Sequence, residues 1–209
     1  MRIDFVSDIA CPWCAVGLNA LEQALARIGS DVPVELHFQP FELNPTMAPE
    51  GADAGEYLKT KYGMGDEQLA KNRAVIRERG AAVGFVFGDR LRVWNTFDGH
   101  RLLHWAGLQG RARELKHALL QAYHGDGRNP SDPAVLRELA AAAGLDADEA
   151  ARVLASDAYA TDVRAAEVEW QRAGIQSVPA VVINRRHLIS GGQPPEVFEE
   201  ALRRIAAEA

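Results

Sequence analysis

Two cysteines, Cys11 and Cys14, separate a strand-like segment from a helix-like one, and this arrangement constrains the fold more than any other feature. Residues 3–6 form a short, mostly apolar run followed by a polar pair, which is typical of a buried strand that ends in a turn. After the motif, apolar residues recur at helical spacing over residues 12–28, and Gly29 stands where a helix commonly ends. The sequence therefore predicts that Cys11 lies at the N-terminus of a helix, directly after a buried strand.

The rest of the chain divides into a long helical block and a second strand-rich segment. Residues 34–39 alternate apolar and polar side chains, as in a strand, and prolines and glycines then predict a loop over residues 44–55. Helical periodicity dominates residues 56–173, where residues 84–93 are the one candidate strand. Residues 180–190 predict two short antiparallel strands, and a final amphipathic helix follows them. The predicted order is strand, helix, strand, helical block, strand, strand, helix.

This order predicts an α/β domain that is interrupted by a large helical insertion. Residues 1–45 and 160–209 together are long enough for a small α/β domain, and residues 46–159 would be the inserted helical domain. Such an insertion is tolerated when the ends of the host chain lie close together at the point of insertion. The sequence contains no internal repeat and no low-complexity segment.

Composition and charge exclude several classes of protein. The 209 residues carry a net charge of −6, which gives no basic face for nucleic acid, so we expect no nucleic-acid partner. No apolar run approaches the roughly 18 residues of a membrane span, and the first residues lack the apolar core of a secretory signal. Two cysteines cannot form a disulfide framework either. We therefore expect a cytoplasmic protein that does not associate with membranes.

The spacing and position of the two cysteines point to thiol chemistry. A thiolate is the nucleophile in disulfide exchange, and the N-terminus of a helix favours a negatively charged sulfur. We expect Cys11 to have a lowered pKa and to attack, and Cys14, one turn further along, to resolve the mixed disulfide. Pro12 presets the first helical turn, and Trp13 places an apolar surface beside the reactive sulfur. This exchange requires no metal and no organic cofactor. Candidate proton acceptors for Cys14 are Glu22, Glu35 and His37.

The order of these motifs resembles a known family. The motif Cys11-Pro12-Trp13-Cys14 between strand and helix, the helical block, the segment 174–180 and the final strands and helix are similar to the DsbA-like thioredoxin-fold oxidoreductases. Within that family, residues 95–104 and 191–198 resemble the FrnE-like branch in particular. The resemblance covers essentially the whole chain. It implies a thioredoxin fold with a large all-helical insertion, and activity as a thiol-disulfide oxidoreductase or isomerase on protein thiols and disulfides.

The resemblance also implies a role for Val178 and Pro179. On the residues alone, a proline before a strand can follow either a cis or a trans peptide bond, and trans is the more frequent form. In the family this position is the cis-proline loop, which lies opposite the cysteines and binds an extended substrate by strand addition. The resemblance therefore implies that Val178 and Pro179 contact the substrate. The exported DsbA proteins carry histidine where this chain has Trp13, so strongly oxidising behaviour is not implied.

Two other functions stay open at this point. Relatives with a similar insertion bind glutathione and small aromatic substrates, so one alternative is a glutathione-dependent isomerase or transferase of the kappa-like type, similar to 2-hydroxychromene-2-carboxylate isomerase. The non-enzymatic alternative is a zinc-binding or chaperone-like module, because His100 and His104 stand four residues apart and could complete a site with the two cysteines. The 85 residues between Cys14 and His100 argue against such a zinc site.

Overall fold

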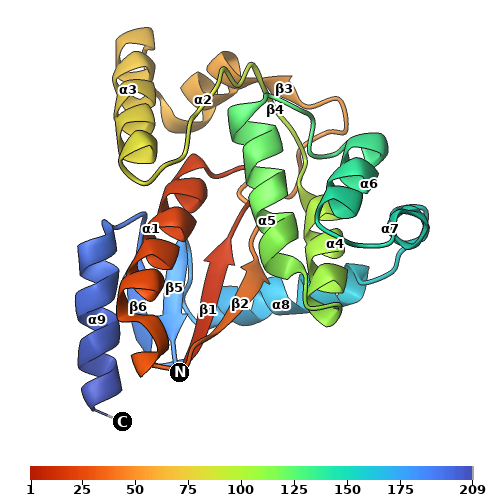
Figure 1. Ribbon diagram of the computed structural model, residues 1–209. Helices are drawn as coiled ribbons and strands as arrows, with labels where there is room; N and C mark the ends of the chain where they lie inside the picture. Colours follow the sequence, from red (N-terminus) through yellow and green to blue (C-terminus); the bar gives the residue numbers. More distant parts are fainter. Residues whose placement is uncertain (209) are drawn as a thin grey trace.

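A four-stranded sheet forms the centre of the computed structural model, which describes residues 1–208 (Figure 1). The strands are β1 (Arg2–Ser7), β2 (Glu35–Pro40), β5 (Ala180–Ile183) and β6 (His187–Ser190), in the order β2-β1-β5-β6. β1 and β2 are parallel, whereas β5 runs antiparallel to both β1 and β6. The sheet thus joins the N-terminal segment of the chain to its C-terminal segment, as the predicted order of strands requires.

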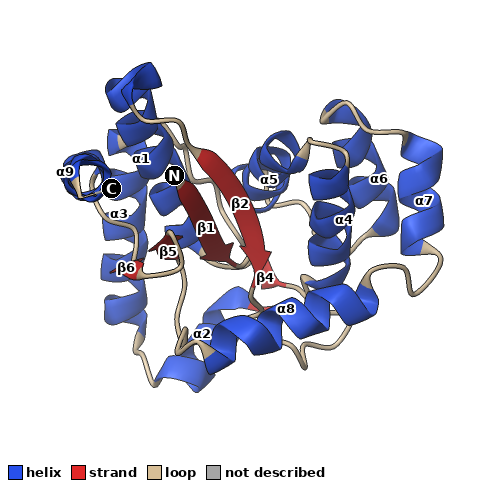
Figure 2. Cartoon of the chain, turned by 90° about the horizontal axis from the view of Figure 1, so that it is seen from below, coloured by secondary structure: helices blue, strands red, loops and turns tan. Residues whose placement is uncertain are grey.

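Helices cover both faces of this sheet. α1 (Pro12–Ile28) and α9 (Pro195–Ala207) lie side by side on one face, where Phe5 of β1 is fully buried (Figure 1). α8 (Ala160–Arg172) lies on the opposite face, where Val6 of β1 packs (Figure 2). Successive side chains of a strand point to opposite faces, so β1 contributes to both cores. A 3₁₀ turn that follows α1 spans Gly29–Asp31.

The segment between β2 and α8 is mostly helical and has two parts. Its elements are β3 (Ala52–Asp53), α2 (Ala54–Tyr62), α3 (Asp66–Ala82), β4 (Arg92–Val93), α4 (Phe97–Leu108), α5 (Ala112–Leu120), a π-helical turn (Gln121–Gly125), α6 (Pro133–Ala142) and α7 (Ala147–Leu154). α4 to α7 pack beyond the β2 edge of the sheet, around a core that includes Trp105, Leu119 and Tyr123 (Figure 2). α2 and α3 form a separate pair at the N-terminal end of α1 (Figure 1).

The predicted strand at residues 84–93 is wrong over most of its length. Only Arg92–Val93 form a strand, β4, which pairs with the equally short β3, and the rest of the segment is a loop. Phe85 is buried in the core beside α1, and its N–H donates to the carbonyl of Gly80, whereas Val86 is 75% exposed. Phe85 therefore anchors a loop to the core, and residues 84–91 have no neighbouring strand with which to form a sheet.

The other predicted elements agree with the structure more closely. α1 spans the predicted residues 12–28, and Gly29 follows it with a φ of 64°, a conformation that favours glycine. The predicted loop over residues 44–55 is shorter than expected, because α2 begins inside it. The side chain of Asp53 accepts a hydrogen bond from the N–H of Glu56 at 2.9 Å and caps this helix.

The apolar cores extend across the predicted domain boundaries. Phe85, which belongs to the predicted insertion at residues 46–159, packs in the core between the sheet and α1. Conversely, Ile9 directly follows the β1 turn and packs in the core of α4 to α7. The division of the chain into two domains stays a prediction. Side chains from each predicted domain pack in the core of the other near the Cys11 motif.

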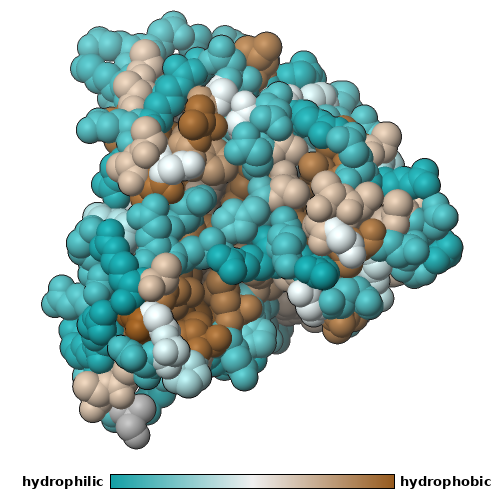
Figure 3. Space-filling model, viewed as in Figure 1, coloured by the Kyte–Doolittle hydropathy of each residue, from teal (hydrophilic) through white to brown (hydrophobic). Residues whose placement is uncertain are grey.

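The surface combines a hydrophilic exterior with local apolar patches. In the view of Figure 3, hydrophilic side chains cover most of the face, and apolar ones emerge in separate patches. No helix within residues 1–208 has the length and apolar character needed to cross a membrane. Tyr62, Val75 and Leu91 are 50%, 47% and 74% exposed, and all three line one cleft beside Cys11.

Candidate active site

Cys11 and Cys14 lie at the junction of β1 and α1, as predicted. Cys11 is the N-cap residue and has an extended backbone, and Pro12 is the first residue of the helix. The N–H of Cys14 donates to the carbonyl oxygen of Cys11 at 3.1 Å, which places the two cysteines within one turn. Both are free cysteines, and Cys11 is 4% exposed whereas Cys14 is fully buried. The sulfur of Cys11 is therefore the one nearer to a substrate.

The pKa values of the two thiols are shifted in opposite directions. A hydrogen bond with the Cys14 thiol lowers the pKa of Cys11, and the backbone N–H groups of Cys14 and Trp13 lower it further, against the effects of burial and of the Asp8 charge. Burial raises the pKa of Cys14 well above its usual value, and the hydrogen bond and charge of Cys11 add to this rise. Cys11 is therefore the thiol that ionises more readily and Cys14 the one that retains its proton, the same direction as the helix N-terminus predicts for Cys11.

Val178 and Pro179 face the cysteines from the segment before β5. The Val178–Pro179 peptide bond is cis, as the resemblance implies, and the carbonyl oxygen of Val178 lies 3.5 Å from Cys11 Sγ. A Cβ atom at Gly17 would lie 3.0 Å from Cγ of Pro179, so the glycine allows α1 and this loop to approach closely. The structure thus brings together residues that stand more than 160 positions apart in the sequence.

A buried carboxylate, Asp8, lies directly before the motif and has four hydrogen-bond donors. The backbone N–H groups of Ala10 and Leu43 donate to it at 3.0 and 2.7 Å. Thr96 Oγ1 and His100 Nε2 lie 2.8 and 3.3 Å from the same carboxylate. Burial alone would raise the pKa of Asp8, yet these bonds, above all that of His100, hold it below its usual value. Asp8 therefore stays charged and ties the turn before Cys11 to the end of β2 and to α4.

A buried cation, Lys116 of α5, adds to the charges around Cys14. Its side chain is 1% exposed, and burial lowers its pKa, while the charges of Cys14 and Asp8 act in the opposite direction. The positive charge of Lys116 in turn opposes the rise in the pKa of Cys14. Cys14 is thus buried beside a lysine whose positive charge, when present, acts against the rise in the pKa of this thiol.

Two side chains from the helical segment hold the turn that precedes Cys11. His124 Nε2 donates to the carbonyl oxygen of Ile9 at 2.8 Å, and Arg90 Nη1 donates to that of Ala10 at 2.9 Å. Burial lowers the pKa of His124 to about 3, so its ring is neutral near pH 7. The helical segment therefore fixes two successive carbonyl groups immediately before the reactive cysteine.

The sequence pattern does not single out these surrounding groups. Lys116, His124 and Arg90 lie in helical or loop segments far along the chain, where nothing in the spacing links them to the cysteines. Asp8 carries one usable signal, an acidic residue directly after a buried strand and three positions before Cys11. Of the predicted proton acceptors, Glu22 is already engaged, because its carboxylate lies 2.7 Å from Nε of Arg113 and 2.9 Å from Nε2 of His117.

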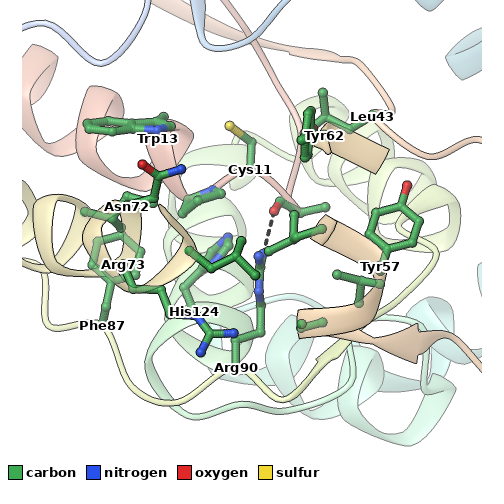
Figure 4. A pocket seen from close by; sticks show the side chains of 18 of the residues that line it. Cys11, Trp13, Leu43, Tyr57, Tyr62, Asn72, Arg73, Phe87, Arg90 and His124 are labelled. Carbon is green, nitrogen blue, oxygen red and sulfur yellow. Dashed lines mark hydrogen bonds between the residues drawn. The ribbon is translucent and has the colours of Figure 1, made fainter. Parts of the chain in front are cut away.

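A cleft of about 870 Å³ opens beside Cys11 (Figure 4). One side includes the motif from Cys11 to Trp13 together with Val178, and most of the rest comes from α2, α3 and the loop at residues 87–91. Figure 4 shows side chains of α2 on one side of Cys11 and side chains of α3 on the other. The labelled residues of these two helices are Tyr57, Tyr62, Asn72 and Arg73. The lining is mostly apolar, with a few polar and charged groups, which is typical of a ligand site.

The two histidines of the zinc alternative have other contacts. His100 is buried against Asp8, and the ring of His104 lies 5.2 Å from that of Tyr159. Within the described part of the chain, no three histidine, cysteine, aspartate or glutamate side chains gather into a group that could hold a metal ion. The predicted set of two cysteines and two histidines therefore does not assemble.

A pair of cysteines at the N-terminus of α1, opposite a cis-proline and beside a four-stranded sheet with helices on both faces, defines the thioredoxin-fold class of thiol oxidoreductases. The chain belongs to one family of this class. The model of the DsbA-like thioredoxin domain family matches residues 2–203, which is nearly the whole chain. The predicted family and fold are thus confirmed.

Individual relatives agree with this assignment. A probable DsbA oxidoreductase from Streptomyces coelicolor is 41% identical, with a TM-score of 0.94 over 100% of this chain and 91% of that one. The uncharacterized Bacillus subtilis protein YwbO is 28% identical over 204 residues, 97% of this chain and 96% of its own. A cytosolic disulfide reductase from Pseudomonas aeruginosa, DsbM, solved with GSH, shares the fold at 17% identity, with a TM-score of 0.69 over 99% of this chain and 100% of that one.

Proposed function

We propose that this protein exchanges thiols and disulfides with protein substrates through Cys11 and Cys14. The observation that carries the proposal is the polarity of the pair, in which the pKa of Cys11 is lowered and that of Cys14 is raised. Cys11 lines the cleft, whereas Cys14 is fully buried behind it. This arrangement supplies one sulfur that attacks and a second that keeps its proton until a mixed disulfide has formed.

Exchange proceeds in two displacements. The Cys11 thiolate attacks one sulfur of a substrate disulfide, the substrate S–S bond breaks, and the other substrate sulfur leaves as a thiolate. Cys14 then gives up its proton and attacks the Cys11 sulfur, which releases the second substrate thiol and leaves a Cys11–Cys14 disulfide. The substrate gains two electrons and the cysteine pair loses two. The same steps in reverse oxidise a substrate dithiol.

Four neighbouring residues would bind the substrate during these steps. The carbonyl of Val178, 3.5 Å from Cys11 Sγ, is placed to accept a backbone N–H from an extended substrate, which is strand addition as a binding mode. Pro179 shapes the loop on that side. On the other side, Pro12 has no N–H that would compete for the sulfur, and Trp13 offers an apolar surface.

The test is an insulin-reduction assay with the two single cysteine variants. Cys11→Ser should lose activity entirely, and Cys14→Ser should accumulate a mixed disulfide with the substrate that gel electrophoresis and mass spectrometry detect. Cys11→Ser with full activity would refute the proposal. We further propose that the protein works in the cytoplasm and uses no metal or organic cofactor. Metal analysis of the purified protein and measurement of its reduction potential against glutathione check these two points.

A second candidate function is a glutathione-dependent isomerisation or transfer on a small substrate. The observation that favours it is the cleft of about 870 Å³ beside Cys11, a volume within the range of small-molecule sites. The fold neighbour DsbM, which was solved with GSH, supports glutathione as a co-substrate here. Glutathione-dependent turnover of a small aromatic substrate by Cys14→Ala, without any disulfide exchange, would favour this candidate over the first.

A further inference from the structure

The cleft beside Cys11 contains two arginines that have no carboxylate partner among residues 1–208. The chain carries a net charge of −6, and many of its arginines form ion pairs with carboxylates. Examples of such paired arginines are Arg2, Arg113, Arg137 and Arg185. Within the cleft, Arg77 pairs with Asp89 at 2.6 Å. Arg73 and Arg90 also line the cleft, yet neither has a carboxylate oxygen within 4.0 Å among residues 1–208.

Arg90 is held in place by the protein itself. Its Nη1 donates to the carbonyl oxygen of Ala10 at 2.9 Å, and its guanidinium carbon lies 5.3 Å from the centre of the Tyr123 ring. A guanidinium has five N–H donors, and these contacts leave part of them unused. Ala10 directly precedes Cys11, so a fixed positive group with free donors lies one residue from the reactive cysteine.

Arg73 supplies a second positive charge from another element. It lies on α3, next to Asn72, and both residues line the cleft (Figure 4). Arg73 is exposed, so its side chain can move toward a bound ligand. The charged groups of the cleft are therefore two unpaired arginines, one paired arginine and the carboxylates of Asp53 and Asp89. Asp53 caps α2 and Asp89 binds Arg77, so both acids are already engaged.

We propose that Arg73 and Arg90 form a carboxylate-binding subsite, which selects disulfides that carry a negative charge close to the sulfur. This inference rests on the proposed exchange at Cys11 and adds the class of substrate. Arginine recognises carboxylates through charge-assisted hydrogen bonds, and the mostly apolar lining accommodates the rest of the ligand. Such a carboxylate can belong to a small acidic disulfide or to an acidic side chain beside a cysteine in an extended segment.

The test follows the oxidation of the reduced protein by symmetrical disulfides in a single turnover. The Cys11 thiolate takes one half of the probe and releases the other half as a thiolate. Cys14 then attacks Cys11 and releases the second half, so one probe disulfide becomes two thiols while the cysteine pair becomes a disulfide. The proton of Cys14 passes to a released thiolate or to water. No further oxidant or reductant takes part in this reaction.

Three probes with two-carbon arms differ only in charge: 3,3′-dithiodipropionate is anionic, bis(2-hydroxyethyl) disulfide is neutral and cystamine is cationic. Each rate is divided by the rate of the same probe with free dithiothreitol, a neutral dithiol, which removes differences in intrinsic reactivity. After this correction, the protein should react about tenfold faster with the anionic probe than with the neutral one, from roughly one charge-assisted hydrogen bond. Cystamine should react more slowly than the neutral probe, because the subsite repels its ammonium groups.

Variants of the two arginines assign the effect to the subsite. Arg90→Gln should lower the anionic-to-neutral ratio about fivefold, and the exposed Arg73→Gln about twofold, because a solvated charge contributes less. Arg90→Lys keeps the positive charge, so its anionic-to-neutral ratio should lie between those of the wild type and of Arg90→Gln. Arg204→Gln on α9 makes the same change in net charge away from the cleft, and its ratio should equal that of the wild type.

A pair of peptide disulfides, one with aspartate and one with lysine beside the cysteine, identifies the source of the carboxylate. A preference for the aspartate peptide that disappears in Arg90→Gln assigns the subsite to extended segments, and a preference confined to dithiodipropionate assigns it to small acidic disulfides. Equal corrected rates for all charges in both series would overturn the subsite. If the neutral probe still forms the Cys11–Cys14 disulfide in that case, the proposed function stands. A reduced protein that no probe oxidises would refute both.

Discussion

The two sides of the Cys11 site come from different parts of the chain and contribute different groups. The sheet side, formed by β1, α1 and the Val178–Pro179 loop, contains both sulfurs and the carbonyl beside Cys11. The helical side, formed by the segment between β2 and α8, contains Lys116, His124 and Arg90, and it supplies most of the cleft. Two sets of contacts join the sides directly before Cys11, those of the Asp8 carboxylate and those of the carbonyls of Ile9 and Ala10.

The two sides therefore have different expected roles, disulfide exchange on the sheet side and the choice of substrate on the helical side. The sheet side alone contains the two sulfurs and the carbonyl to which the proposed exchange assigns attack, resolution and substrate binding. The helical side holds the turn before Cys11 and determines which ligands fit beside it. Changes on the sheet side should therefore alter whether exchange occurs, whereas changes on the helical side should alter stability, pKa values and the choice of substrate.

The largest effect on stability is expected at Asp8, where the two sides meet. Asp8→Asn removes a buried charge with four hydrogen-bond partners, and loss of hydrogen bonds to a buried charged group costs about 3 kcal/mol. Because the pKa of Asp8 is lowered in the folded protein, its contribution is present above the unfolded pKa and is lost as the pH falls through the folded value. Urea unfolding at pH 7 and pH 5 should give a similar loss.

The same variant should also lower the pKa of the reactive thiol, Cys11. The charge of Asp8 raises the pKa of Cys11, so Asp8→Asn should lower that pKa while it destabilises the fold. Thiolate absorbance as a function of pH measures this change. A variant that unfolds more easily but leaves the pKa of Cys11 unchanged would show that Asp8 acts through structure alone.

His124 tests the second link between the sides through the pH dependence of stability. Its pKa is about 3 in the folded protein because the ring is buried, so the folded state resists a proton that the unfolded chain binds below about pH 6.5. Stability should therefore fall as the pH falls from 6.5 towards 3, by about 2 kcal/mol at pH 5 from this residue alone. His124→Gln, which keeps a donor for the Ile9 carbonyl, should remove this part of the slope.

His117 provides the matched control for this slope. It lies on α5 and pairs with the carboxylate of Glu22 in a partly exposed position. His117→Gln should leave the loss of stability between pH 6.5 and pH 5 in place. If the His124 variant retains the full wild-type slope, the buried neutral imidazole is not its cause.

The contrast between the sides also explains what the sequence could predict. β1, α1 and the C-terminal strands can be predicted from local signals in the sequence. These signals are short apolar runs for the strands and a helical repeat that ends at Gly29 for α1, and β1 and α1 together place Cys11. The helix N-terminus also predicts the direction of its pKa shift, to which the hydrogen bond with the Cys14 thiol contributes most and the backbone N–H groups of Cys14 and Trp13 contribute further. The groups around it do not follow, because Thr96 and His100 reach Asp8 across about 90 positions. Spacing along the chain carries no information about such contacts.

The predicted strand at residues 84–93 failed for a related reason. A short apolar run such as Phe85-Val86-Phe87 forms a strand only when another strand lies beside it, and the structure instead packs Phe85 and Phe87 against the core as anchors of a loop. The N–H of Gly88 accordingly donates to the carbonyl of His124 at 2.9 Å rather than to a neighbouring strand. Tertiary packing, which the sequence pattern does not contain, decides between the two outcomes.

A smaller effect is expected from two glycines, one on each side of the site. Gly17→Val on α1 would press a branched side chain against Pro179, and such overpacking costs about 1 to 2 kcal/mol and moves the loop away from Cys11. Gly107→Ala near the end of α4 meets open space and should stabilise the protein by about 0.5 kcal/mol. Unfolding curves and insulin reduction measure both. Equal activity in the two variants would contradict a role for the close approach of α1 and Pro179.

The smallest effect concerns two buried acids, Glu42 after β2 and Glu167 on α8. Both bind Arg164, with Glu167 at 2.8 Å from its Nη1, and Oε1 of each acid has no hydrogen-bond partner among residues 1–208. Burial raises the pKa of both acids, and their mutual repulsion adds to the rise for Glu42. A raised pKa means that the protonated form stabilises the fold, and this contribution is lost as the pH rises through the folded value.

Glu167→Gln, which cannot ionise, should therefore stabilise the protein relative to the wild type by about 1 kcal/mol at pH 8, and the gain should vanish near pH 4. Glu169→Gln on the same helix is the control, because Glu169 is exposed and binds only Arg185 at the surface. Its small effect should not change between pH 5 and pH 8. A Glu167→Gln variant that is equally destabilised at pH 4 and pH 8 would contradict this prediction. It would show that the ion pair with Arg164 stabilises the fold more than the burial of the two acids destabilises it.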